Sequence, residues 1–88
     1  MKEYEFFRIK GCLKVLSIIG NFDSLRYTDI EIEYIKKTEE KLSPSTLLKC
    51  LKDLERNKLI GKEKDKYKIT SRGREVLMLL ERLSHDDL

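Results

Sequence analysis

The chain has 88 residues, of which 40% are hydrophobic and 40% charged, and its 19 basic and 16 acidic residues give a net charge of +3. This length suits one small domain with a single core, and it leaves no room for a second domain or a large ligand cavity. No apolar run approaches the about 20 residues of a membrane span, and no charged-then-apolar leader opens the chain. We therefore expect a soluble, cytoplasmic protein with no membrane partner.

The amino-acid composition does not identify the host, but the number and spacing of cysteine and histidine residues bear on metal binding. The chain has 13 Lys, 6 Arg and no Ala, Gln or Trp, a composition found in hyperthermophiles but also produced by an AT-rich genome, so a cellular or viral host stays open. Cys12 and Cys50 are far apart, with no CxxC pattern and only His85 as a further soft ligand, which excludes a zinc finger. Both cysteines lie in apolar periodic segments, which favours buried free thiols over a disulfide. No metal and no cofactor are expected.

The first predicted helix covers residues 5–19, where apolar residues recur at helical spacing. Gly11 lies inside this helix. Gly20, followed by Asn21, is expected to end it, because glycine accepts the left-handed conformation that often follows a helix. Residues 25–27 then form a short stretch that can be extended.

The second predicted helix covers residues 29–37. Thr28 and Glu31 fit a capping box, in which the Thr hydroxyl accepts a hydrogen bond from a free amide and the Glu reaches back three residues. The apolar face of this helix is expected to contain Ile30, Tyr34 and Ile35.

The third predicted helix covers residues 44–56 and has the clearest signals. Ser43 is a typical capping residue, and Pro44 at the first helical position loses no useful hydrogen bond. Asn57 is expected to end the helix in a left-handed turn. The core side is defined by Leu47, Leu51 and Leu54, with Leu48 beside them.

Residues 59–70 are expected to form a two-stranded hairpin with its turn at residues 64–66. Alternation places Tyr67 and Ile69 on one face of the second strand and its lysines on the other. Thr70 or Ser71 then caps a last helix over residues 71–84.

The predicted order is helix, short strand, two helices joined by a short loop, two hairpin strands and a final helix (α-β-α-α-β-β-α). This mainly α arrangement with a small β-hairpin is the outline of a winged helix-turn-helix, and we expect residues 1–88 to form a single domain of that kind.

Positive charge is concentrated in one part of the chain. Residues 41–74 carry 11 basic and 4 acidic side chains, whereas residues 1–40 have a net charge of −1 and residues 75–88 a net charge of −3. The hairpin alone has four lysines against Glu63 and Asp65. A basic region of this kind is the electrostatic footprint of a polyanionic partner.

The third predicted helix carries part of this charge on the side opposite its leucines. Small hydroxyl side chains near its N-terminus would let the helix enter a groove of a nucleic acid, and the long basic side chains that follow can reach bases or phosphates. The positive N-terminal end of the helix also favours a phosphate near residues 43–45. The side chains on this arc are Ser45, Thr46, Lys49, Lys52, Asp53 and Arg56. Exposed lysines are often only solvated, and on an edge strand they also discourage aggregation. Their joint placement on the helix and on the adjacent hairpin is what favours nucleic acid.

The stretch RYTDIEIEYIKKTEEKLSPSTLLKCLKDLERNKLIGKEKDKYKITSRGREVL resembles the winged-helix transcriptional regulators of the HxlR, PadR and MarR kind. It also resembles the short archaeal winged-helix proteins that bind DNA and dimerise through the C-terminal helix. In these families the basic hairpin is called the wing, which corresponds here to residues 59–70. YKITSRGREVL is similar to the Y-x-L-T-x-x-G-x-x-L pattern at the end of that wing. The chain differs from them in having Asn57 and Lys58 where a glycine is usual, in lacking an extreme N-terminal cysteine, and in being too short for the extra helices of MarR proteins, so no small-molecule effector is expected.

The resemblance implies that the helix over residues 44–56 lies in the major groove of double-stranded DNA, with the wing on the backbone or in the minor groove, and that a homodimer binds a pseudo-palindrome. Ser45, Thr46 and Lys49 would then read bases. Together, the residues expected to bind DNA are Ser43, Ser45, Thr46, Lys49, Lys52, Lys62, Lys64, Lys66 and Lys68.

The last predicted helix contains the apolar run VLMLL at residues 76–80. Its core stripe is Val76, Leu80 and Leu83, while Met78 and Leu79 point elsewhere. A helix that is apolar on more than one side needs more than one partner surface, and we expect the second surface to be another copy of the chain, although the N-terminal segment could instead cover the run. The expected dimer contacts are Tyr4, Phe6, Phe7, Met78, Leu79 and Leu83.

These patterns favour a non-enzymatic, homodimeric, nucleoid-associated transcriptional regulator that binds DNA. The alternatives are an architectural DNA-binding protein with little sequence preference and a winged-helix module for protein interaction. No catalytic residues are expected, because the chain has no Gly-rich phosphate loop and no acid pair at the spacing of a known motif. The operator, any redox signal through Cys12 or Cys50, and the choice between repression and activation stay open.

Overall fold

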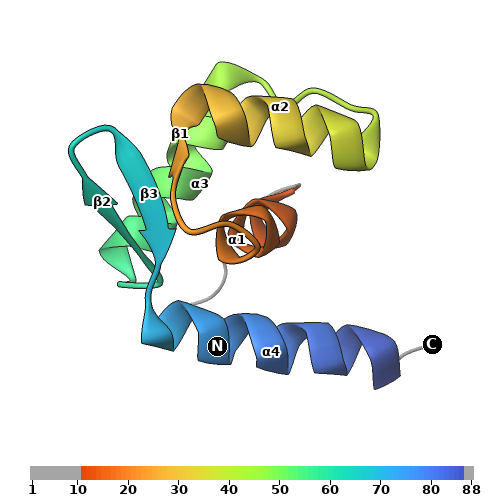
Figure 1. The fold of residues 1–88 in the computed structure, drawn as a ribbon. Coiled ribbons are helices and arrows are strands. Elements are labelled where there is room, and N and C mark those ends of the chain that lie inside the picture. The colour runs from red at the N-terminus through yellow and green to blue at the C-terminus, as the bar shows by residue number, and fades with distance from the viewer. Residues whose placement is uncertain (1–10, 87–88) are drawn as a thin grey trace.

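The computed structural model describes residues 11–86, with side chains described as far as Arg82. The elements in chain order are α1 (Cys12–Gly20), β1 (Leu25–Arg26), α2 (Tyr27–Thr38), α3 (Pro44–Arg56), β2 (Ile60–Glu63), β3 (Lys66–Ile69) and α4 (Ser71–Asp86). This order confirms the predicted fold class. In Figure 1, α1 lies between α2 above and α4 below, with the small sheet beside it.

The sheet has three antiparallel strands in the order β1-β3-β2. The hairpin of β2 and β3 closes at the pair of Glu63 and Lys66, so its turn is residues 64–65 and one residue shorter than predicted. β1 extends the sheet by pairing Leu25 with Tyr67. The short extended stretch of the sequence is therefore the third strand of the wing's sheet.

α1 is the centre of the core because it is apolar nearly all round and packs against α2, α3, α4 and β3. Its fully buried side chains are Cys12, Val15, Leu16, Ile18 and Ile19. Other parts of the chain complete the core with Leu25, Ile30, Tyr34, Leu42, Leu47, Cys50, Leu51, Leu54, Leu59, Ile60, Tyr67, Val76 and Leu77. Cys12 and Cys50 are buried free thiols, as predicted. Within residues 11–86, no helix has both the length and the apolar content to cross a membrane.

The predicted start of the first helix was partly wrong. Residues 5–10 lie outside the described part of the chain, but Gly11, predicted inside the helix, has φ = 85° and precedes α1 as its N-cap. That left-handed conformation cannot continue an α-helix and is one that glycine adopts without strain. A Cβ at Gly11 would also overlap the Tyr34 hydroxyl.

Gly20 ends α1 for a different reason from the one predicted. It is the last helical residue, and Asn21 after it has φ = −87°, so no left-handed residue follows the helix. Instead, α4 and β3 pack closely here: a Cβ on Gly20 would lie 3.1 Å from Leu77 Cδ2 and 3.2 Å from Ile69 Cδ1. The sequence predicts a conformational role for Gly20, whereas in the structure the glycine allows close packing of α4 and β3.

α2 begins two residues earlier than predicted. The Arg26 N–H donates to Asp29 Oδ2 at 3.2 Å, so Asp29 closes the first turn and the predicted box of Thr28 and Glu31 was wrong. Ile30 and Tyr34 are buried as predicted. Ile35 is 42% exposed, because it follows Tyr34 by about 100° around the helix and leaves the buried arc.

α3 has the predicted bounds, and Ser43 caps it by accepting a hydrogen bond from the Thr46 N–H at 3.2 Å. Asn57 has φ = −86°, so the predicted left-handed turn does not occur there. Lys58, the next residue, has φ = 62° and takes that conformation instead.

α4 runs two residues beyond its predicted end. Thr70 caps it, because the Gly73 N–H donates to Thr70 Oγ1 at 3.0 Å. The Thr70 hydroxyl in turn donates to the Lys58 carbonyl at 2.7 Å, which ties the end of the sheet to the chain leaving α3.

Candidate nucleic-acid interface

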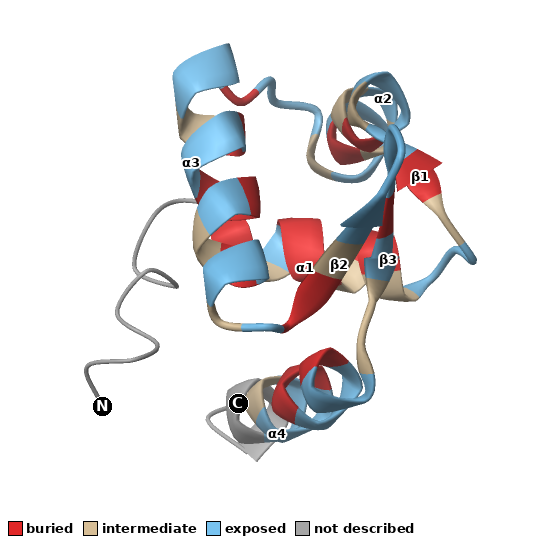
Figure 2. Cartoon of the chain, turned by 90° about the vertical axis from the view of Figure 1, so that its left-hand side faces the viewer, coloured by how far each residue is buried: buried red, intermediate tan, exposed pale blue. Residues whose placement is uncertain are grey.

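α3 has one buried and one exposed side, and the exposed side faces away from the rest of the molecule (Figure 2). Because a helix turns by about 100° per residue, its exposed residues form one continuous arc opposite the core. We call the part of it that follows Pro44 the α3 arc; its members are Ser45, Leu48, Lys49, Lys52, Glu55 and Arg56. Three of the six are basic and one is acidic, so the arc is basic overall.

The hydroxyl side chains at the start of α3 form one cluster. Ser43 Oγ donates to Thr46 Oγ1 at 2.8 Å and lies 3.3 Å from Ser45 Oγ. Ser43 and Ser45 are exposed, but Thr46 is half-buried and engaged with the cap. Of the residues predicted to read bases, Ser45 and Lys49 therefore lie on the α3 arc, and Thr46 lies at its margin.

Asp53 was predicted on the exposed arc but lies outside it. Its side chain is only 17% exposed, and its Oδ1 is 3.8 Å from Nη1 of Arg56. At that separation, with Arg56 mostly exposed, the pair contributes little to stability. The guanidinium of Arg56 stays on the α3 arc and available to solvent.

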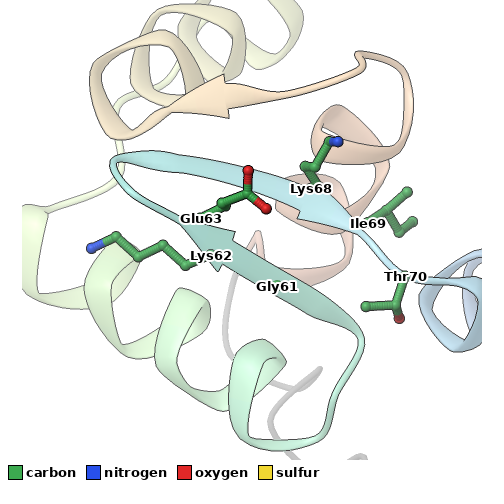
Figure 3. A pocket seen from close by; sticks show the side chains of 6 residues that line it. All are labelled: Gly61, Lys62, Glu63, Lys68, Ile69 and Thr70. Carbon is green, nitrogen blue, oxygen red and sulfur yellow. The ribbon is translucent and has the colours of Figure 1, made fainter.

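The four lysines of the wing do not share one face. Lys62 lies on the same face as Tyr67, with its Nζ 5.4 Å from the ring centroid, within reach of a cation–π contact. Lys66 and Lys68 lie on the opposite face, because side chains alternate along a strand, and Lys64 occupies the turn with φ = 59°. All four are exposed. In Figure 3, Lys62 extends away from Lys68, so a partner approaching from one side would meet only some of these charges.

Arg26 is a basic residue of the wing region that the sequence analysis missed. β1 places it beside Lys66, and its Nε lies 3.3 Å from Oδ2 of Asp65 in the turn. Both side chains are more than half exposed, so this pair adds little stability. Arg26 does offset the negative charge of Asp65, one of the two acidic residues of the hairpin. In the sequence, the extended character of residues 25–27 was the only sign that Arg26 lies in a strand, and it did not show that this strand pairs with β3.

Of the shallow hollows that lie against the wing, two border Lys62. One, of about 270 Å³, connects the start of α2 to the face of the wing that carries Lys62. It is lined by Arg26, Tyr27, Thr28, Lys62, Asp65 and Tyr67. The other, of about 170 Å³, lies along the strands near Gly61 and Lys68 (Figure 3). The first extends the basic surface of the wing toward α2.

α4 carries the predicted dimer contacts that fall within the described side chains. Met78 is 62% exposed and Leu79 is 60% exposed, and with Glu75 and Arg82 they line an open hollow of about 270 Å³. The other side of α4 packs on the core through Val76 and Leu77. The remaining predicted contacts lie outside the described side chains: Tyr4, Phe6, Phe7 and Leu83.

Among the described residues, no group of three or more His, Cys, Asp or Glu side chains could hold a metal ion.

Comparison with known proteins agrees with this architecture. A family model described as a winged helix-turn-helix matches residues 30–86, which extend from the first turns of α2 to the end of α4. Searches of the curated proteins and of the solved structures found no match. The family match covers more than half of the chain and includes α3, the wing and α4. The protein therefore belongs to the winged helix-turn-helix family, whose fold is a DNA-binding one.

Proposed function

We propose that this protein is a non-enzymatic transcriptional regulator that binds duplex DNA as a homodimer, with α3 in the major groove and the wing on the backbone. The observation that carries the proposal is the α3 arc. It places Lys49, Lys52 and Arg56 on the side of α3 away from the core, in a fold of the DNA-binding kind. The adjacent wing adds four exposed lysines, which do not all share one face.

The residues of the α3 arc suit a groove. The major groove of B-DNA is about 12 Å wide and admits a helix, and the small Ser45 side chain near the helix start would allow close approach. Lys49 is one turn further along and could reach the acceptors O6 and N7 of guanine. The wing lysines would contact phosphates, which position a protein on DNA without reading sequence.

The homodimer is supported by the order of side chains on α4. Met78 and Leu79 lie at the centre of its exposed apolar patch, with Glu75 three residues before Met78 and Arg82 three residues after Leu79. If two copies of α4 pack antiparallel about a two-fold axis, Met78 meets the partner's Leu79 and Glu75 meets the partner's Arg82. The patch is then complementary to itself, as a two-fold interface requires.

DNA binding can be tested by fluorescence anisotropy with a random-sequence duplex of about 30 base pairs in a salt series. If six to ten basic side chains per dimer meet phosphates, affinity should fall about 10³- to 10⁵-fold between about 50 and 200 mM salt. Lys49→Glu combined with Lys64→Glu should remove most of this dependence.

The matched control is Lys36→Glu combined with Lys37→Glu, which makes the same change in charge at the end of α2 away from the wing (Figure 1). This control should bind nearly as wild type does. An affinity that hardly responds to salt, or no binding even at low salt, would refute the proposal and favour a protein-interaction module. Similar affinity for all sequences would instead favour an architectural DNA-binding protein.

A further inference from the structure

The α3 arc contains one apolar residue, Leu48, which is 44% exposed. The sequence predicted Leu48 beside the core leucines, but the structure turns it outward. At about 100° per residue, Leu48 lies about 40° from Lys52 and about 60° from Ser45 around the helix. It is therefore part of the same surface as the basic residues that the proposed function assigns to DNA.

The core does not need this leucine. The apolar side of α3 is already complete, because its four inward-facing side chains are each at most 1% exposed: Leu47, Cys50, Leu51 and Leu54. Single exposed leucines are common on protein surfaces. Leu48 differs in its position, because it lies on the helix proposed to enter the groove and one turn before Lys52.

The chemistry of the major groove limits what a leucine there can recognise. Each base pair presents hydrogen-bond donors and acceptors, and thymine in addition presents an apolar C5-methyl group. A leucine side chain has neither donor nor acceptor, so the methyl group is the part of that pattern with which it can make a favourable contact. Contact between the two would remove apolar surface of both from water.

We propose that Leu48 is a specificity-determining residue that contacts a thymine methyl group and makes the protein prefer a T·A pair at that position. This inference rests on the proposed function, since it requires α3 to lie in the major groove. The gain from one buried methyl contact corresponds to about a three- to tenfold preference.

The test removes the methyl group from the DNA and the leucine from the protein, separately and together. Preferred sites are first selected with wild-type protein from a pool of random duplexes, and each thymine of a selected site is then replaced singly by uracil, which lacks only the methyl group. At one thymine in each half-site, uracil should weaken wild-type binding about three- to tenfold. Leu48→Ala should weaken binding to the thymine duplex similarly and should show no further loss with uracil. The two effects are then non-additive, as expected for groups in contact.

The control variant is Glu55→Ala, which changes another exposed side chain of the α3 arc one heptad later. It should keep the full response to uracil whatever its overall affinity. Equal responses to uracil in wild type and Leu48→Ala, or no response in either, would overturn the role of Leu48 while DNA binding stands. Absence of binding to any duplex by wild-type protein would overturn both proposals.

Discussion

The thiols of Cys12 and Cys50 meet in the core, where α1 packs against α3. The hydrogen bond with Cys50, together with burial, raises the pKa of the Cys12 thiol above its ordinary value of 9.0. The thiolate is the form that reacts with alkylating reagents. A thiol that is both buried and held protonated is therefore protected twice, by restricted access and by the scarcity of its reactive form.

We expect the Cys12 thiol to stay unmodified when native protein is treated with iodoacetamide at about pH 8, and to react fully once the chain is unfolded in denaturant. Mass spectrometry of tryptic peptides would measure the extent of modification. Ser45→Cys provides the control, because it places a thiol on the exposed α3 arc, where it should react within the same incubation. Modification of native Cys12 at the rate of that exposed thiol would contradict the buried arrangement.

Among the structural elements, the junction of the wing and α4 depends on Gly73. A Cβ at this position would overlap the Leu59 carbonyl oxygen and lie 2.7 Å from Ile69 Cγ1. Because the overlap is with backbone, Gly73→Ala should lower the free energy of unfolding by about 1–3 kcal/mol, a range typical of overpacking. Urea denaturation followed by circular dichroism would measure the change.

Gly61 in β2 is the matched control, because a Cβ there meets nothing within 4 Å and its φ is not positive. Gly61→Ala should raise the free energy of unfolding by about 0.5–1 kcal/mol, since alanine has less backbone entropy to lose on folding. Equal stability of the two variants would show that the close approach at Gly73 carries no energetic weight.

Elements whose signals are local were predicted well. The start of α3 is marked by Ser43 and Pro44, which are adjacent to it in the sequence, and both ends of this helix were predicted to the residue. Features that depend on distant residues were missed or misread. Nothing near Gly20 indicates that Leu77 will pack on it, and nothing near Arg26 indicates that β1 will pair with β3.

The candidate interface shows the same division between local and tertiary information. Helical periodicity correctly opposed Lys49 and Lys52 to the core leucines, but it assigned Leu48 to the core and Asp53 to the surface. Both lie near the boundary of the buried arc, where the neighbouring elements decide burial. Lys58 shows a further limit: it adopts φ = 62°, a conformation that lysine is not expected to favour.

At the scale of the whole molecule, the proposed antiparallel pairing of α4 makes a prediction about charge. Glu75→Arg and Arg82→Glu should each weaken the dimer, because either change sets like charges opposite each other twice across the two-fold axis. Two such contacts should raise the dimer Kd about tenfold, and the double variant should restore it. Sedimentation equilibrium would measure the Kd, and failure of the double variant to recover would rule out this arrangement.

The apolar centre of the same patch should matter more than its charges. Leu79→Asp should raise the dimer Kd at least about a hundredfold, because burial of each such side chain contributes about 1.5–3 kcal/mol and the axis repeats it. Ile32→Asp, on the exposed side of α2, should leave the dimer intact. Since a dimer presents two α3 arcs and two wings to the duplex, the monomeric Leu79→Asp variant should also show about half the salt dependence of wild-type DNA binding. An unchanged slope in a variant shown to be monomeric would mean that a single copy makes all the phosphate contacts, and that dimerisation serves another purpose.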